Sequence, residues 1–252
     1  MKRKLTHGWN PDLPDHRDHQ YSAPNHLLAT LPPSLSLESG CPKVYDQQAL
    51  GSCTSNAIAA AIEFDRLKEK LPDWTPSRLF IYYNERVIEK TVKSDSGAQI
   101  RDGIKSVNTK GACREATWPY EIKKFAQTPP PAAFTEGAQH TAVTYQQVTQ
   151  TLTQLKGCLV SGYPVVFGFT VYESFESDEV AQTGIVNLPT SQEKVLGGHA
   201  VLLVGYNDTT QRFRVRNSWG VDWGQKGYFE MPYAYVTSKN LASDFWTIQL
   251  VK

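Results

Sequence analysis

The first half of the chain carries apolar residues at helical spacing. Positions 53–70 are apolar around much of a helix circumference, and the run Ala59-Ala60-Ala61 allows close packing from several sides. The pattern predicts a buried central helix that becomes amphipathic from position 65 and is stopped by Pro72. We expect Ser52 or a neighbour to cap its first turn.

Two further helices follow in the same half. The first is predicted at 77–88, with Val87 and Ile88 among its core candidates, and the second at 100–109, where Gly111 ends it. The proline-rich stretch 127–138 then indicates a connector.

The second half changes to the short apolar runs and alternating patterns that are typical of strands. A short helix is expected first, at 145–155. The predicted strands are 164–169, 200–206, 212–216, 227–231 and 246–251. Helices followed by strands indicate an α+β protein with two lobes.

These patterns divide the chain into three expected parts. Residues 1–30 form an N-terminal arm, 31–140 a mainly helical lobe, and 141–252 a β-rich, barrel-like lobe. We expect a functional cleft between the two lobes.

The arm is irregular and broken by prolines, yet it holds four of the chain's six histidines: His7, His16, His19 and His26. A metal site would need several of these histidine side chains to converge on one point, and an irregular segment gives no indication of such an arrangement. We therefore favour the interpretation that these side chains are solvated. The apolar residues Trp9, Leu13, Tyr21 and Leu27-Leu28 are expected to pack the arm against the body.

Composition narrows the class of protein. The 252 residues are 40% apolar and 20% charged with a formal net charge of +1, which is ordinary for a globular protein. A nearly neutral chain is not steered to nucleic acid or to a membrane surface, so neither is expected as a partner. We expect a monomer.

Targeting signals and metal motifs are also not evident. No apolar run is long enough to span a bilayer, and no apolar segment follows the basic start at Met1–Lys4. We therefore expect a cytoplasmic protein, or one exported without a conventional signal peptide. Cys41, Cys53, Cys113 and Cys158 match no zinc spacing, and no metal or cofactor is expected.

Cys53 opens the predicted central helix and follows Gly51-Ser52. A thiol is a useful nucleophile only as the thiolate, and the unpaired N–H groups of a helix start stabilise that anion. A lone buried cysteine is more often structural, so the hypothesis of a nucleophile requires a base.

Two histidines lie in the predicted body. His140 belongs to the polar connector and is expected at the surface, whereas His199 follows two glycines and precedes an apolar strand. That strand and the one before Asn217 should form an antiparallel hairpin, whose turn lies midway between His199 and Asn217. We predict that these side chains face each other and that Trp219 shields their hydrogen bond from water.

The motifs resemble those of the papain-like cysteine peptidases, in particular their bacterial branch. The matching segments are Gly51-Ser52-Cys53, Trp118-Pro119-Tyr120, Gly198-His199-Ala200-Val201, Val204-Gly205-Tyr206, Arg216-Asn217-Ser218-Trp219-Gly220, Trp223-Gly224 and Gly227-Tyr228. The resemblance extends from about Pro32 to Lys252. It implies a two-lobed papain-like fold and an endopeptidase that acts on peptide or protein substrates without a cofactor.

The resemblance also implies roles. Cys53 would attack the scissile carbonyl, His199 would protonate the leaving amine, and Asn217 would orient His199. The family places a glutamine six residues before the nucleophile as oxyanion donor, which is Gln47 here; Gln48 competes but lies one residue too close.

Substrate contacts are implied at small residues around the nucleophile and the base. The residues expected there are Gly51, Ser52, Gly97, Ala98, Gly197, Gly198 and Trp219. The wall of the substrate pocket is sought at Phe167, Gly168 and Ser243.

The chain departs from the family pattern at Leu50, where many relatives have a cysteine, and at Thr54, where many have an aromatic residue. The usual long helical pro-region is missing. The arm is expected either to restrain the enzyme as a short pro-segment, as in a zymogen, or to cover a lobe surface. Two alternatives stay open: an acyltransferase or deamidase with the same fold, and a non-enzymatic peptide-binding module.

Overall fold

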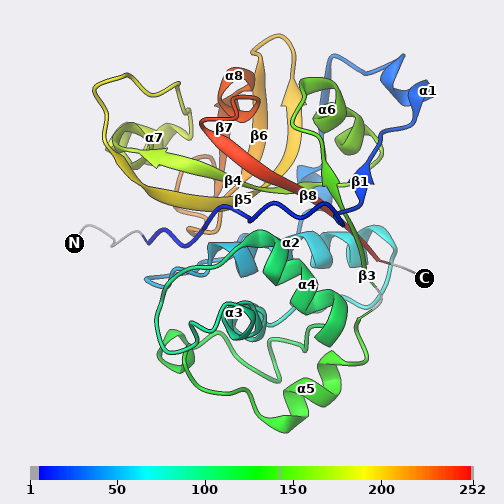
Figure 1. The fold of residues 1–252 in the computed structure, drawn as a ribbon. Coiled ribbons are helices and arrows are strands. Elements are labelled where there is room, and N and C mark those ends of the chain that lie inside the picture. Colours follow the sequence, from blue (N-terminus) through cyan, green and yellow to red (C-terminus); the bar gives the residue numbers. More distant parts are fainter. Residues whose placement is uncertain (1–5, 142, 251–252) are drawn as a thin grey trace.

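The computed structural model describes residues 6–141 and 143–250 (Figure 1). Its α-helices are α1 (Asn25–Leu28), α2 (Cys53–Lys68), α3 (Arg78–Ile88), α4 (Ile100–Lys110), α5 (Pro131–Gly137), α6 (Leu152–Val160), α7 (Asp178–Thr183) and α8 (Tyr233–Val236). Its strands are β1 (Gln20–Tyr21), β2 (Ser34–Ser36), β3 (Val143–Val148), β4 (Val165–Tyr172), β5 (Val195–Asn207), β6 (Arg212–Arg216), β7 (Tyr228–Pro232) and β8 (Ala242–Leu250). Within these two ranges no helix is both long and apolar enough to cross a membrane.

The strands form one open sheet in the order β1-β3-β8-β4-β5-β6-β7, and β2 pairs with β5 beside this path. All the pairings are antiparallel except that of β1 with β3. Helices α2, α3, α4 and α5 lie together on one side of the molecule, and most of the sheet with α6, α7 and α8 lies on the other (Figure 1).

Helix α2 lies at the centre because its small residues admit neighbours on several sides. Ala59, Ala60 and Ala61 are at most 2% exposed. They share one apolar cluster with Leu202 of β5 and Trp246 of β8, so the helix packs directly on the sheet. This confirms the predicted central helix.

The expected cap of α2 is confirmed in position but not as a side-chain hydrogen bond. Ser52 occupies the N-cap position, but its side chain makes no capping bond. Its hydroxyl hydrogen bonds with the Tyr120 hydroxyl instead, and the Asn56 side chain donates to the Ser52 carbonyl oxygen at 2.8 Å.

Three other sequence predictions need correction. The segment 145–155 is not a helix: β3 ends at Val148 and α6 begins at Leu152, because residues 143–147 pair along β8. The connector 127–138 contains α5, which Pro131 starts from a favourable first position. Val87 and Ile88 are 37% and 41% exposed, whereas Glu85 and Arg86 of the same turn are buried, so only one side of the last turn of α3 faces the core.

The hairpin of β5 and β6 forms, but its register differs from the prediction. Leu202 pairs with Arg216 and Leu203 with Val215, and the register then shifts near Gly205. Extending this register by one residue would put Val201 opposite Asn217. His199 therefore lies two positions along β5 from the residue that faces Asn217. Because side chains alternate with a period of two, His199 and Asn217 still share one face of the hairpin.

The arm crosses the molecule between the helical side and the sheet before it reaches β1 and α1 at the sheet edge (Figure 1). Trp9 and Tyr21 are buried as expected, at 7% and 8% exposure. Leu13 is 69% exposed, so its expected packing is wrong. The arm therefore has two parts: a crossing segment up to about Asp18, and an edge segment from Gln20 onward that extends the sheet through β3.

Candidate active site

Cys53 is the first residue of α2, and its side chain is fully buried. The loop before it is fixed by Asp95, whose two carboxylate oxygens each accept the Gly51 N–H at 3.0 Å. Tyr82 donates its hydroxyl to the same carboxylate at 2.5 Å and accepts the Gly97 N–H at 3.2 Å. The two small-residue loops beside the thiol are thus held to one another.

His199 and Asn217 meet at the start of the hairpin. The Nε2 atom of His199 lies 2.8 Å from the Oδ1 atom of Asn217, and both residues are buried. The Trp219 ring stacks on the imidazole with centroids 4.7 Å apart. Among the described residues, Nδ1 of His199 is buried without a hydrogen-bond partner, so this nitrogen is available for another group.

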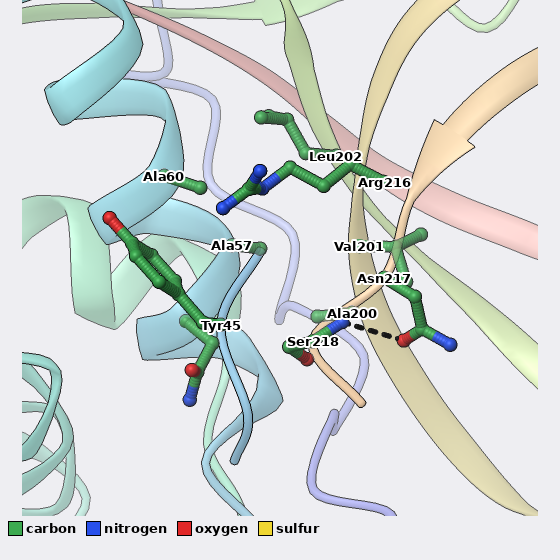
Figure 2. A pocket seen from close by; sticks show the side chains of 10 residues that line it. Tyr45, Ala57, Ala60, Ala200, Val201, Leu202, Arg216, Asn217 and Ser218 are labelled. Atoms are coloured by element: carbon green, nitrogen blue, oxygen red, sulfur yellow. Dashed lines mark hydrogen bonds between the residues drawn. The ribbon is translucent and has the colours of Figure 1, made fainter. Parts of the chain in front are cut away.

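Gln47 is joined to the same group of residues through Ser218. The Ser218 hydroxyl donates to Oε1 of Gln47 at 2.7 Å, and its backbone N–H donates to Oδ1 of Asn217 at 2.8 Å (Figure 2). The Gln47 amide group donates to the Leu50 carbonyl oxygen at 3.0 Å. Gln48 is exposed and belongs to none of these contacts, which separates the two candidate glutamines.

A small cavity of about 10 Å³ lies behind this site, between α2 and the bases of β5 and β6 (Figure 2). Arg216 extends across it and donates to the Pro42 carbonyl oxygen at 2.6 Å. Its guanidinium carbon lies 5.0 Å from the centroid of the Tyr45 ring. These contacts anchor the strand end that carries Asn217.

The arm lies directly on the site through backbone pairing on both sides. The Trp9 N–H donates to the Gly198 carbonyl oxygen at 3.0 Å. The Ala98 N–H donates to the Gly8 carbonyl oxygen at 2.8 Å, and the Asn10 N–H donates to the Ala98 carbonyl oxygen at 3.0 Å. The arm therefore occupies the surfaces at which the sequence predicted a substrate backbone.

Gly8 is the point of closest approach. A Cβ atom at Gly8 would lie 1.8 Å from the Gly51 carbonyl oxygen, and one at Gly97 would lie 2.3 Å from the Gly8 carbonyl oxygen. Neither atom fits without moving the backbone. A glycine is thus required for the arm to pass between these two loops.

His7 covers the histidine side of the site. A Cβ atom at Gly197 would lie 2.8 Å from the His7 Cβ. The His7 Nε2 atom lies 2.8 Å from Oε1 of Glu176. Beneath this cover, Cys53, His199 and Gln47 are each 0% exposed.

Exclusion of water changes the acidity of both reactive groups. Burial raises the pKa of the Cys53 thiol to about 12, although the N–H groups of Ala200, Gly8 and Thr54 lower it in part. Burial lowers the pKa of His199 to about 3, although the hydrogen bond that its Nε2–H donates to Asn217 raises it in part. Each shift disfavours the charged form, so the covered site holds a neutral thiol and a neutral imidazole at neutral pH.

The residues predicted to form the wall of the substrate pocket do not all lie at the site. Gly168 touches the arm, as described below, whereas Phe167 stacks on Phe245 with centroids 5.2 Å apart in a separate core. Sequence reasoning missed Asp244, which accepts a hydrogen bond from the Trp9 indole. No motif marks this aspartate, and only its neighbour Ser243 was a candidate.

Metal ligands and disulfides do not enter the site. Within residues 6–141 and 143–250, no group of three or more histidine, cysteine or acidic side chains has a geometry for a metal ion. Cys41, Cys53, Cys113 and Cys158 are free thiols.

Comparison with known families matches residues 36–245 to the papain family of cysteine proteases. An uncharacterized peptidase C1-like protein of Acanthamoeba polyphaga mimivirus is 48% identical over 233 residues, which cover 89% of this chain and 73% of the viral protein. A cathepsin B-like cysteine proteinase of Caenorhabditis elegans is 36% identical over 95 residues, which cover 37% of this chain and 27% of that protein.

Solved structures give the same result for the fold. Xylellain, a cysteine protease from Xylella fastidiosa, superposes with a TM-score of 0.94 at 43% identity, covering 100% of this chain and 99% of xylellain. Procathepsin B from Trypanosoma congolense superposes with a TM-score of 0.74 at 18% identity, covering 97% of this chain and 85% of that one. The second likeness concerns the fold alone.

Proposed function

The chain belongs to the papain family of cysteine proteases, and on that premise we propose that it is an endopeptidase whose reaction depends on Cys53, His199, Asn217 and Gln47. The observation that carries this proposal is the hydrogen-bonded series from His199 through Asn217 and Ser218 to Gln47. The thiol at the start of α2 is the nucleophile that this series would serve.

The first half of the proposed reaction forms an acyl-enzyme. The Cys53 proton passes to Nδ1 of His199, and the resulting thiolate attacks the scissile carbonyl carbon. The Gln47 amide and the Cys53 backbone N–H donate to the oxygen that becomes negative. His199 then gives its proton to the leaving amine, the C–N bond breaks, and a thioester remains on Cys53.

The second half releases the acid product. The neutral His199 takes a proton from water while the water oxygen attacks the thioester carbon. The C–S bond breaks, sulfur leaves as the thiolate, and the carboxylic acid departs. Asn217 accepts the N–H at Nε2 throughout, which keeps Nδ1 directed to the reacting atoms.

Replacement of the nucleophile tests the assignment. The Cys53→Ala chain is expected to hydrolyse no peptide at a rate above background, whereas the Cys41→Ala chain should keep wild-type kcat/KM. Peptidase activity retained by Cys53→Ala contradicts the proposal. Both variants are compared by thermal melting, so that a folding defect is recognised.

The alternative chemistries leave different products. Hydrolysis divides a peptide into two fragments, transfer to an added amine caps one fragment, and deamidation leaves the peptide whole. Mass spectrometry of the products separates the three. A peptide-binding module without activity would leave the peptide unchanged and would not turn over.

We also propose that the crossing segment of the arm restrains the enzyme. Its support is the complete burial of Cys53 and His199 under the arm and the pKa shifts that make both groups neutral. Gly8→Ala should force the arm away from Gly51 and raise kcat/KM on a small peptide, because the added Cβ has no room. Unchanged kcat/KM would contradict the restraint.

A matched control lies in the same segment. Leu13→Ala changes an exposed side chain of the arm and should leave kcat/KM unchanged. These substitutions are sharper than deletion of residues 1–30, because deletion also removes Tyr21, which belongs to the buried core of the sheet.

A further inference from the structure

Trp9 fills a slot that the proposed chemistry does not use. The residue is 7% exposed, and its ring lies against two glycines on adjacent strands. A Cβ atom at Gly168 of β4 would lie 2.0 Å from the indole, and one at Gly198 of β5 would lie 2.6 Å from it. The absence of side chains at both positions thus makes room for the indole on this face of the sheet.

The inner end of the slot is polar. The indole Nε1 of Trp9 donates to Oδ2 of Asp244 at 3.0 Å, and the Asp12 backbone N–H donates to the same oxygen at 2.8 Å. Both donors belong to the arm. When the arm leaves, the Asp244 carboxylate loses both hydrogen bonds and can accept new ones from a group that takes the place of the arm.

The slot is placed to receive a substrate side chain. The Trp9 backbone N–H donates to the carbonyl oxygen of Gly198, the residue next to His199. Trp9 also lies in the same apolar cluster as Cys53 and Ala200. An extended substrate that replaced the arm at the Gly198 carbonyl would direct one of its side chains between the two glycines.

We propose that Asp244 makes this slot selective, when a substrate takes the place of the arm, for a large, flat side chain whose far edge carries an N–H donor, tryptophan first. The inference rests on the proposed function and names its substrate class. Leucine or phenylalanine fills the slot but leaves the Asp244 oxygen without a donor. Tryptophan supplies both the ring and the hydrogen bond, as Trp9 does.

A neutral donor fits better than a cation because a positive charge is already present. Burial raises the pKa of Asp244, and Arg101 of α4 lies close enough to offset part of this shift. Its guanidinium is held by Asp18 and by the Leu13 carbonyl oxygen. A lysine or arginine side chain in the slot would be repelled by this guanidinium.

The test uses peptides that differ in one residue. Tryptophan, 3-benzothienylalanine and leucine are scanned through each position around one scissile bond, and kcat/KM is measured with the full-length chain. Benzothienylalanine has the shape of tryptophan with sulfur in place of N–H. The arm competes with every peptide alike, so the ratio of two kcat/KM values on one preparation cancels the fraction of molecules that are covered.

We expect one position at which tryptophan exceeds benzothienylalanine by roughly tenfold or more, because the acceptor is a carboxylate. Asp244→Gly removes the carboxylate while suiting the backbone φ of 59°, and should bring the ratio close to one. Asp244→Asn keeps the shape, tolerates the same φ and should give an intermediate ratio. Gly168→Ala should transfer the preference to leucine, because its Cβ occupies the space of the ring.

The outcomes are distinguishable. Turnover with a ratio near one at every position overturns the pocket, and a ratio that survives in Asp244→Gly overturns the role of Asp244. Absence of turnover of all peptides, even by the Gly8→Ala chain in which the arm is displaced, overturns the proposed function itself.

Discussion

Gln47 and Gln48 are adjacent in the chain and have opposite surroundings. The Gln47 N–H donates to the Ser218 carbonyl oxygen at 2.8 Å, which aligns this short segment with the end of the hairpin. This pairing places Gln47 in a buried position against Ser218. The chain turns at Gln48, whose φ is 55°, and that side chain is exposed.

Substitution of these two glutamines gives a matched pair. Gln47→Ala should lower kcat/KM by about 10²–10³, because one donor to the oxyanion is lost. Gln48→Ala should leave kcat/KM close to wild type. The comparison is made by steady-state kinetics in the Gly8→Ala background; equal losses for both variants would contradict the assignment of the donor.

Alkylation reports the state of the Cys53 thiol. With its pKa raised to about 12, the covered thiol stays protonated at neutral pH and should react slowly with iodoacetamide. In Gly8→Ala the site is open to water, and Cys53 should react roughly tenfold faster or more. Peptide mapping follows each cysteine, with the partly exposed Cys41 as internal reference. Equal Cys53 rates in both chains would count against the restraint.

Residue patterns in the sequence identify the proposed reactive groups but not the proposed specificity residue Asp244. Cys53, His199 and Asn217 stand out because a helix start and a hairpin place them in local patterns. Asp12 and Asp244 do not, because they are 232 positions apart and meet only in the folded chain. Their isolated side chains are ordinary in sequence.

The arm and β8 are joined by a crossed pair of contacts. Trp9 of the arm donates its indole N–H to Asp244 of β8, at 3.0 Å. In return, Trp246 of β8 donates its indole N–H to Asp12 of the arm, at 2.8 Å. Burial and the neighbouring Asp244 raise the pKa of Asp12 to about 7.

The junction between the arm and β8, formed by these contacts of Asp12 and Asp244, predicts that docking of the arm depends on pH. Docked Asp12 keeps its proton up to about pH 7, whereas a displaced Asp12 would lose it near its ordinary pKa of 3.8. Docking therefore takes up a proton between these values and weakens as pH rises through this range, then levels off. The raised pKa of Asp244 acts in the same direction, while the nearby Arg101 opposes both.

The measurement is the ratio of kcat/KM for wild type to that for Gly8→Ala, since the titration of Cys53 and His199 in the open site is common to both. This ratio should rise between about pH 4 and 7 in the wild type. In Asp12→Asn this rise should be smaller, because only the titration of Asp244 remains at the junction. A ratio that falls with pH in the wild type would contradict the assigned sign.

Element type followed from the sequence where periodicity was strong. The apolar circumference of 53–70 specified α2, and the alternation of 212–216 specified β6. The helix predicted at 145–155 is wrong because strand residues and helix residues adjoin there. The pairing of Tyr145 with Ile248 makes the first part of the segment a strand. The predicted register of the β5–β6 hairpin is wrong because the shift near Gly205 leaves no signal in the spacing of residues along the sequence.

Taken as a whole, the molecule uses its arm in two ways. The edge segment builds the fold: Tyr21 belongs to the core of the sheet, and a Cβ at Gly157 would lie 2.6 Å from Leu28. The crossing segment covers the site. The sequence pattern predicts a single arm at residues 1–30. Irregular residue spacing does not distinguish a segment that pairs with a strand from a segment that covers a site.

Stability and activity should therefore change in opposite directions when Trp9 is truncated. Trp9→Ala removes a buried ring from the apolar cluster around α2 and should lower the free energy of unfolding by about 3 kcal/mol. The melting temperature should fall by roughly 2–4 °C per kcal/mol for a chain of this size.

Calorimetry and peptide hydrolysis on the same preparation check both signs. Activity should rise as the melting temperature falls. Leu13→Ala, at an exposed position of the same segment, should change neither. A Trp9→Ala chain with lowered stability and lowered activity would contradict the expected opposition.

The junction of Asp12 with Asp244 also has a consequence for biosynthesis. A ribosome makes residue 244 long after residue 12, and the two are 232 positions apart. Strand β8 supplies Asp244 and Trp246 and also pairs with β4 at the centre of the sheet. Strand β8 thus contributes both to the sheet and to the docking site of the arm, so we expect the arm to dock only after β8 has been made and has joined β4.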